Sequence, residues 1–154
     1  MLGYADADSG AQEHRRSISG YTFLIDRGAI SWASRKQELV ALSTAEAEYV
    51  ALTHATKEGI WLCRLLIELS LFDISPVPLL CDNQSALKLS IEDNFHARTK
   101  HIDTHYHYIR DVIAKNFIEA IYCPTEDMAA DALTKPLLAW KLKKHLLELR
   151  LLCD

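Results

Sequence analysis

The chain has 154 residues, of which 49% are hydrophobic, 25% charged and 8% aromatic. These proportions are ordinary for one globular domain and exclude a disordered tail, a collagen-like repeat and a disulfide-dense miniprotein. The apolar runs are far shorter than the roughly 20 residues that cross a membrane, and the net charge of −4 argues against a protein that coats nucleic acid through charge alone.

The first forty residues have the composition of β-strands. Strand-like runs occupy residues 2–6, 17–25 and 29–34, and a short Gly-containing link, DRG at 26–28, joins the last two. Two such runs joined by a short link of this kind predict a hairpin. We therefore expect the first three strands to be antiparallel.

A long helix is predicted after Ser43. Ser43 and Glu46 form a capping box, in which a hydroxyl and a carboxylate satisfy free backbone N–H groups. Residues 47–69 follow, with Gly59 as a weak point. The apolar residues that fall largely on one helical face are Ala47, Ala51, Ala55, Leu62, Leu65, Leu66 and Leu69.

The second half alternates strands and helices. The predicted elements are a buried strand at 79–81, a short helix at 85–90, a helix at 102–115 ended by Asn116, a strand at 117–123, a helical segment at 126–133 and a final helix at 137–152. In the final helix we expect Leu142, Leu146 and Leu149 in the core and Lys141, Lys143 and Lys144 mainly at the surface. A mixed α/β sheet flanked by helices follows.

Four carboxylates fall on four separate elements. Asp6 ends the first strand, Glu48 lies in the first turns of the long helix, Asp82 follows the short buried strand, and Asp131 lies in the late helical segment. Such positions allow them to converge above the sheet, where clustered carboxylates suit hard cations such as Mg²⁺. Two such ions would stabilise the attacking and leaving oxygens of a phosphoryl displacement.

Plainer explanations remain open at this point. Glu48 can be a helix cap, Asp82 a turn former and Asp131 solvated surface. Asp8 shares a face with Asp6 on a strand and could assist it as a ligand. Glu46 could compete with Glu48, although the capping box already accounts for it.

Seven short motifs occur in order along nearly the whole chain. They are YADAD (4–8), RRSISGYTF (15–23), ISWASRKQ (30–37), ALSTAEAEYVAL (41–52), CDNQSA (81–86), RTKHID (98–103) and ADALTKPL (130–137). Together they resemble the ribonuclease H domain at the C-terminal end of copia-type LTR retrotransposon polyproteins. The resemblance implies a single ribonuclease H domain over 1–154, with a five-stranded mixed sheet and the helix at 137–152 packed on it.

The resemblance also implies an activity. The matching carboxylates are Asp6, Glu48, Asp82 and Asp131, expected to bind two Mg²⁺ ions, with Mn²⁺ as a substitute. The implied reaction is metal-dependent hydrolysis of the RNA strand of RNA–DNA hybrids during reverse transcription. The implied partner is the adjacent reverse transcriptase domain. We expect an intracellular, cytoplasmic domain, within virus-like particles, that is monomeric when isolated and has no membrane contact.

The four cysteines, none in a C-x-x-C pair, are expected to be reduced and buried.

Several side chains are candidates for contacts with the hybrid. Asn83, Gln84 and the backbone near Thr44 lie beside the carboxylates and could recognise the 2′-OH that separates RNA from DNA. Gln84 could equally be an ordinary residue at a helix start. Phosphate contacts position a duplex without recognising its sequence, and the basic candidates for them are Arg15, Arg16, Arg35, Lys36, Arg98, Lys100 and His101.

One feature departs from the wider family. Many cellular ribonucleases H have a mobile histidine before the last acid, but residues 124–130 (PTEDMAA) contain none. Glu126 or His101 could replace it. His101 and His105 could instead share a helix face in a zinc site.

Two other functions remain open. The alternatives are a catalytically weak module that binds hybrid or docks on the polymerase, and a different nuclease with the same fold, such as a junction resolvase or an integrase.

Overall fold

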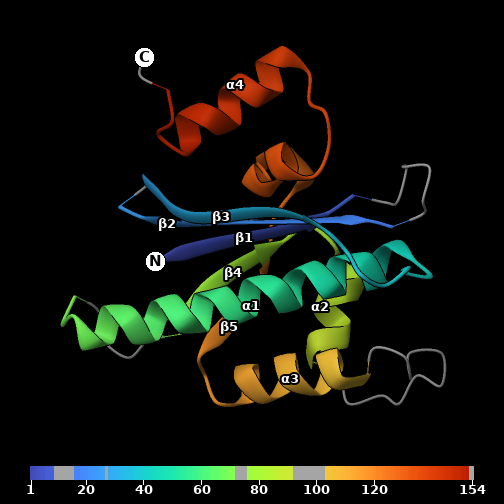
Figure 1. Cartoon of the computed structure of the whole chain (residues 1–154), viewed down its shortest axis with the longest axis vertical. Coiled ribbons are helices and arrows are strands. Elements are labelled where there is room, and N and C mark those ends of the chain that lie inside the picture. The colour runs from blue at the N-terminus through green and yellow to red at the C-terminus, as the bar shows by residue number, and fades with distance from the viewer. Residues whose placement is uncertain (9–15, 27, 72–75, 92–102, 153–154) are drawn as a thin grey trace.

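A mixed five-stranded sheet forms the centre of the molecule (Figure 1). The computed structural model describes residues 1–8, 16–26, 28–71, 76–91 and 103–152. The strands are β1 (Leu2–Ala7), β2 (Ile18–Ile25), β3 (Gly28–Lys36), β4 (Val77–Cys81) and β5 (Ile118–Tyr122). Their order is β3-β2-β1-β4-β5, antiparallel from β3 to β1 and parallel from β1 to β5. The predicted five-stranded mixed sheet and its antiparallel beginning are confirmed.

Helices cover both faces of the sheet. The long helix α1 (Thr44–Glu68) lies on one face together with α2 (Gln84–Ile91) and α3 (Asp103–Ala114). The other face carries the short 3₁₀ helices η2 (Thr125–Asp127) and η3 (Ala129–Leu133) and the helix α4 (Ala139–Glu148). The main core lies between the sheet and α1, and its largest fully buried side chains include Phe23, Tyr49, Leu52 and Leu79.

The start of α1 has the predicted cap. Ser43 Oγ accepts a hydrogen bond from the Glu46 N–H at 3.2 Å, and Glu46 Oε2 accepts one from the Leu42 N–H at 2.6 Å. The carboxylate therefore binds one residue before the capping residue itself. This cap fixes where α1 begins, and so which residues of its first turns face the sheet.

Removing the cap should cost stability. We expect Ser43→Ala to lower the free energy of unfolding by about 1 kcal/mol, because an N–H at the start of α1 loses its partner. Ser43→Asp should keep most of it, since a carboxylate also accepts this bond. Urea unfolding followed by circular dichroism measures both variants, and equal losses in the two would contradict the role of the cap.

The far end of α1 differs from the prediction. Leu65 and Leu69 are exposed, at 37% and 57%, and the buried residues of the helix end at Cys63. At about 1.5 Å per residue a helix of 25 residues is roughly 37 Å long, whereas a strand of eight spans only about 27 Å. The helix is longer than the sheet that it covers, so its last turns bury little.

Gly59 has a packing role within α1. A Cβ atom there would lie 3.0 Å from Phe23 Cζ and 3.3 Å from Ile118 Cδ1. The residue predicted as a weak point therefore lets α1 approach the sheet closely.

The last forty residues need two corrections. Residues 126–133, predicted as helical, form two 3₁₀ helices instead of an α-helix. In the final helix, Leu142 is 36% exposed and Leu146 is only partly buried; the buried residues are His145 within α4 and Leu149, which caps its end. The first turn of α4 lies away from the sheet, as exposed Leu138 and Trp140 indicate, so Leu142 does not reach the core.

Other predictions hold. Asn116 has a left-handed backbone, with φ of 58°, after α3, as expected for a helix end. Cys63, Cys81 and Cys123 are buried and free, while Cys153 lies outside the described residues. Among the described helices, none combines the length and the apolar character needed to span a membrane.

Candidate metal centre

Three carboxylates from three elements meet at one end of the sheet. Asp6 lies near the end of β1, Asp82 directly follows β4, and Glu48 lies in the second turn of α1. One oxygen atom of each lies within 4.8 Å of the others. The parallel pairing of β1 with β4 places their carboxyl ends at the same edge, and the capped start of α1 brings Glu48 over it.

Two of the three carboxylates are buried, and the cluster is electrostatically unfavourable without a cation. Asp6 is fully buried and Glu48 is 7% exposed. Burial, with the charges of Asp6 and Asp82 added to it, raises the pKa of Glu48 to about 9. Burial likewise raises the pKa of Asp6 to about 6, against the opposing effects of Thr134 and Lys135. A folded chain keeps such a group of acids only at a cost in stability, which a bound cation would offset.

Each of the three carboxylates has one oxygen held by a neighbour. Glu48 Oε2 accepts a hydrogen bond from the Ala7 N–H at 3.1 Å, and Asp82 Oδ2 accepts one from Thr125 Oγ1 at 2.8 Å. Asp6 Oδ2 accepts a hydrogen bond from the Thr134 hydroxyl. These bonds fix the orientation of the carboxylates.

The fourth predicted carboxylate, Asp131 in η3, is fully buried but does not belong to this group. Its Oδ1 lies 2.8 Å from Lys135 Nζ, and its Oδ2 lies 2.6 Å from Lys141 Nζ. Lys135 Nζ also lies 3.7 Å from Asp6 Oδ1. Asp131 is therefore linked to Asp6 indirectly, through the ammonium group of Lys135. The prediction that Lys141 lies mainly at the surface is wrong, because its side chain is only 19% exposed.

Gly20 makes room for this arrangement. It pairs with Asp6 across the β1–β2 ladder. A Cβ atom at Gly20 would lie 2.7 Å from Thr134 Cγ2, 2.9 Å from Leu133 Cβ and 3.2 Å from the Ala130 carbonyl oxygen. The missing side chain lets η3 pack directly on β2, which brings Thr134 to Asp6.

The residues present fit a hard divalent cation. The three converging side chains offer only oxygen ligands, which Mg²⁺ and Mn²⁺ prefer. Asp6 Oδ1 is buried and accepts no hydrogen bond from the described residues, so it remains available as a ligand. We therefore regard Asp6, Glu48 and Asp82 as a candidate metal centre.

Other predicted site residues have different surroundings. Asn83 Oδ1 accepts hydrogen bonds from the Ser85 and Ala86 N–H groups, both at 3.0 Å, and so caps α2. Asp8 Oδ1 accepts one from the Ile18 N–H at 2.5 Å, which ties β1 to the start of β2. The predicted site residues that are exposed at the surface are Arg16, Arg35, Lys36, Thr44, Gln84 and Glu126.

Some predicted site residues lie outside the described part of the chain. Arg15, Arg98, Lys100 and His101 lie outside the described residues, and so does the side chain of His105. The proposed hybrid contacts and the alternative zinc site therefore stay predictions.

Sequence reasoning missed Thr125, Thr134, Lys135 and Lys141 as residues that contact the carboxylates of this centre. Thr134 and Lys135 lie within the motif ADALTKPL, but only Asp131 was singled out there. The motif was the signal that could have pointed to both residues.

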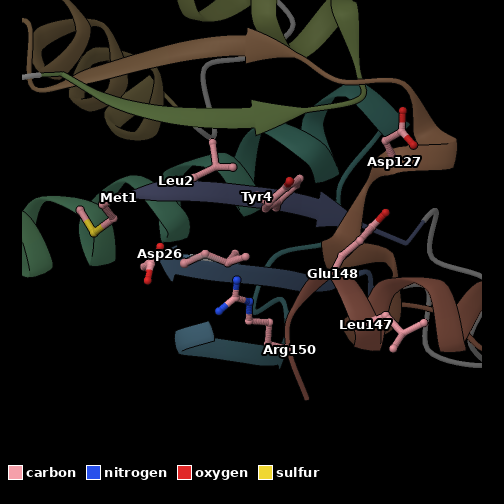
Figure 2. Close-up of a pocket in the computed structure, with 9 residues that line it drawn as sticks. Met1, Leu2, Tyr4, Asp26, Asp127, Leu147, Glu148 and Arg150 are labelled. Carbon is pink, nitrogen blue, oxygen red and sulfur yellow. The ribbon is translucent and has the colours of Figure 1, made fainter. Parts of the chain in front are cut away.

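The shape of the molecule alone would not identify this centre. A cavity of about 620 Å³ lies between the beginning of the sheet and α4, lined by Met1, Leu2, Tyr4, Leu24 and residues of α4 (Figure 2). It includes none of the three converging carboxylates. The chemistry of the side chains identifies the candidate centre, not the depth of a pocket.

Comparison with known proteins gives consistent matches. No protein-family model matches the chain. It is 48% identical over 136 residues to the Retrovirus-related Pol polyprotein from transposon TNT 1-94 of Nicotiana tabacum, covering 88% of this chain and 10% of that protein. It is 38% identical over 135 residues to the corresponding polyprotein from transposon RE1 of Arabidopsis thaliana, covering 87% of this chain and 9% of that protein. The chain thus spans about a tenth of the length of these relatives.

The fold is also that of a solved enzyme. The crystal structure of LC11-RNase H1 in complex with RNA/DNA hybrid matches with a TM-score of 0.61 and 16% identity, over 86% of this chain and 92% of that one. At this identity the match establishes the fold and leaves the chemistry to the residues described above.

Proposed function

Because the chain belongs to the ribonuclease H domains of copia- and Ty1-type retrotransposon Pol polyproteins, we propose that it hydrolyses the RNA strand of RNA–DNA hybrids with the help of divalent cations. The observation that carries the proposal is the convergence of Asp6 and Glu48, both buried, with the partly exposed Asp82 on one point. The proposed ligands are these three residues, with Asp131 beside them as a fourth.

The roles of the residues follow from their contacts. Asp6, Glu48 and Asp82 would bind the cations, while Thr134, the Ala7 N–H and Thr125 hold one oxygen of each in place. Bound Mg²⁺ would stabilise the charge on the attacking and leaving oxygens of the phosphodiester. Thr44 and Gln84, which are exposed and close in sequence to Glu48 and Asp82, are the proposed contacts to the hybrid strands.

The setting of the reaction is part of the proposal. The domain would remove template RNA during reverse transcription, next to the reverse transcriptase domain of the same polyprotein and inside virus-like particles. The basic residues Arg15, Arg16, Arg98 and Lys100, with His101, would contact the phosphates. With a net charge of −4, we expect a weak, salt-sensitive hold on the hybrid.

Cleavage of a labelled RNA–DNA hybrid tests the proposal. We expect cutting of the RNA strand in low salt with Mg²⁺ or Mn²⁺, none with EDTA, and none by Asp6→Asn. Asp111→Asn is the matched control, because it removes one carboxylate charge from an exposed ion pair on α3, and it should cut normally. A folded domain that binds hybrid but never cuts it would contradict the proposal.

That last outcome defines the second candidate, a hybrid-binding or polymerase-docking module. The observation in its favour is that Lys135 and Lys141 already neutralise Asp131. Equal cutting of double-stranded DNA would instead favour a different nuclease on this fold.

A further inference from the structure

Lys135 lies between two of the proposed ligands. Its Nζ is 2.8 Å from Asp131 Oδ1 and 3.7 Å from Asp6 Oδ1. Among the described residues, Lys135 is the one that forms ion pairs with both Asp131 and Asp6. Its neighbour Thr134 binds the other oxygen of Asp6. Of these two successive residues, Thr134 therefore fixes Asp6 through Oδ2, and Lys135 places a positive charge near Oδ1 without a hydrogen bond to it.

Lys141 has a different relation to the centre. It pairs with Asp131 Oδ2 and donates to the Thr125 carbonyl oxygen at 3.3 Å, and none of its ion pairs reaches Asp6. Lys141 can therefore stay on Asp131 when a cation binds at Asp6. Lys135 cannot stay in place if a cation binds between Asp6 and Asp131, because two positive centres would share the same oxygens.

We propose that Lys135 is a positioning residue that acts as an internal counter-ion, filling the space between Asp6 and Asp131 until a second divalent cation displaces its ammonium group. This inference rests on the proposed function. The centre then binds one cation tightly at Asp6, Glu48 and Asp82, and the second only at higher concentration. The side chain of Lys135 is 35% exposed, so its ammonium can move into solvent without opening the core.

Cation binding without nucleic acid tests the inference. Calorimetric titration with Mn²⁺ should give one tight and one weak site in the parent chain. In Lys135→Gln, which keeps a hydrogen-bond donor but loses the charge, we expect the weak site to tighten by about tenfold or more, since one charge at this distance contributes at least that much. Lys135→Arg keeps the charge and should bind as the parent does.

A second readout is the gain in thermal stability on adding Mg²⁺. Without metal, Lys135→Gln leaves Asp131 and Asp6 less compensated, so its melting temperature should fall. Saturating Mg²⁺ should then raise it by more than it raises that of the parent. Lys144→Gln is the charge-matched control, because Lys144 pairs with Asp127 outside the cluster, and its gain should equal that of the parent.

The outcomes separate this inference from the proposed function. If Lys135→Gln binds Mn²⁺ as the parent does, or stays unfolded at saturating Mg²⁺, Lys135 is not an exchangeable counter-ion and the inference is wrong. The metal centre itself fails only if Asp6→Asn and Glu48→Gln bind cations as tightly as the parent. A weak site that tightens in Lys135→Gln and stays weak in Lys135→Arg would support the inference.

Discussion

Glu48→Gln should make the metal-free protein more stable at pH 8 and abolish cation-dependent cleavage. The two effects have one cause. Glu48 is buried beside Asp6 and Asp82, which raises its pKa from 4.5 to about 9. A neutral amide avoids this repulsion and can still accept the hydrogen bond from the Ala7 N–H. As a cation ligand, however, Gln has lost the charge that Mg²⁺ needs.

The dependence on pH gives the sign of the stability effect. A carboxyl group whose pKa is raised on folding is most favourable to the folded state below its unfolded pKa, near 4.5, and loses this contribution as the pH rises to about 9. The metal-free parent should therefore lose stability across this range, with Asp6 adding a loss up to about pH 6. Glu48→Gln should lack most of the loss above pH 6.

Chemical unfolding in EDTA at several pH values measures this effect. We expect the two proteins to be about equal at pH 4.5 and Glu48→Gln to be more stable by about 2 kcal/mol at pH 8, a fraction of the full shift at about 1.4 kcal/mol per pKa unit. With Mg²⁺ the parent should be the more stable of the two proteins. Cleavage by Glu48→Gln should fall by more than about a hundredfold, which exceeds the loss seen when a residue that only supports a metal ligand is removed. A less stable Glu48→Gln at pH 8 without metal would show that the cluster is not repulsive.

Gly20→Ala should disrupt the candidate metal centre although Gly20 is not one of its ligands. The new methyl group would lie 2.9 Å from Leu133 Cβ and 3.2 Å from the Ala130 carbonyl oxygen. These atoms belong to η3, which must move away from β2. We expect a loss of about 1–3 kcal/mol, typical of overpacking. Cleavage should fall as well, because the shift separates Thr134 from Asp6 and takes Asp131 with it.

Gly28→Ala is the matched control. Among the described residues, a Cβ atom at Gly28 would meet just the Ile25 carbonyl oxygen, at an ordinary 3.6 Å. Melting temperatures and cleavage rates of the two variants should therefore differ sharply, with Gly28→Ala close to the parent. If Gly20→Ala cleaves as fast as Gly28→Ala, the packing of η3 on β2 is not needed for activity.

The segments that could be predicted from sequence are those with a regular pattern of residues. The strands and α1 follow periods that can be recognised in the residues, and Ser43 fixes a helix start by a local bond. Asp6, Glu48 and Asp82 were identifiable because each stands at the end or start of such an element. Asp131 was expected with them from its place on the late helical segment, the resemblance matched the same four acids, and the structure puts Asp131 close by, although tied to lysines.

The segment around Asp131 was harder to predict for a physical reason. Residues 125–133 form short 3₁₀ turns, which have no 3.6-residue pattern to recognise. Lys135 precedes a proline, and Lys141 lies on a helix whose buried face centres on His145, so both have the local sequence of surface residues. The contact of Lys135 with Asp6 and the contacts of Lys141 with Asp131 and Thr125 come from tertiary packing, which no local pattern encodes.

The hydrogen bond from Thr134 to Asp6 joins positions 128 residues apart. Strand β1 is among the first parts of the domain to be synthesised, and the segment that binds Asp6 of the candidate metal centre through Thr134 is among the last. Contacts of such long sequence separation form slowly and late in folding. A newly made chain therefore passes through a stage in which the acids of β1 and α1 exist without their C-terminal partners. Nuclease activity should appear on the ribosome only after the last helix has been released.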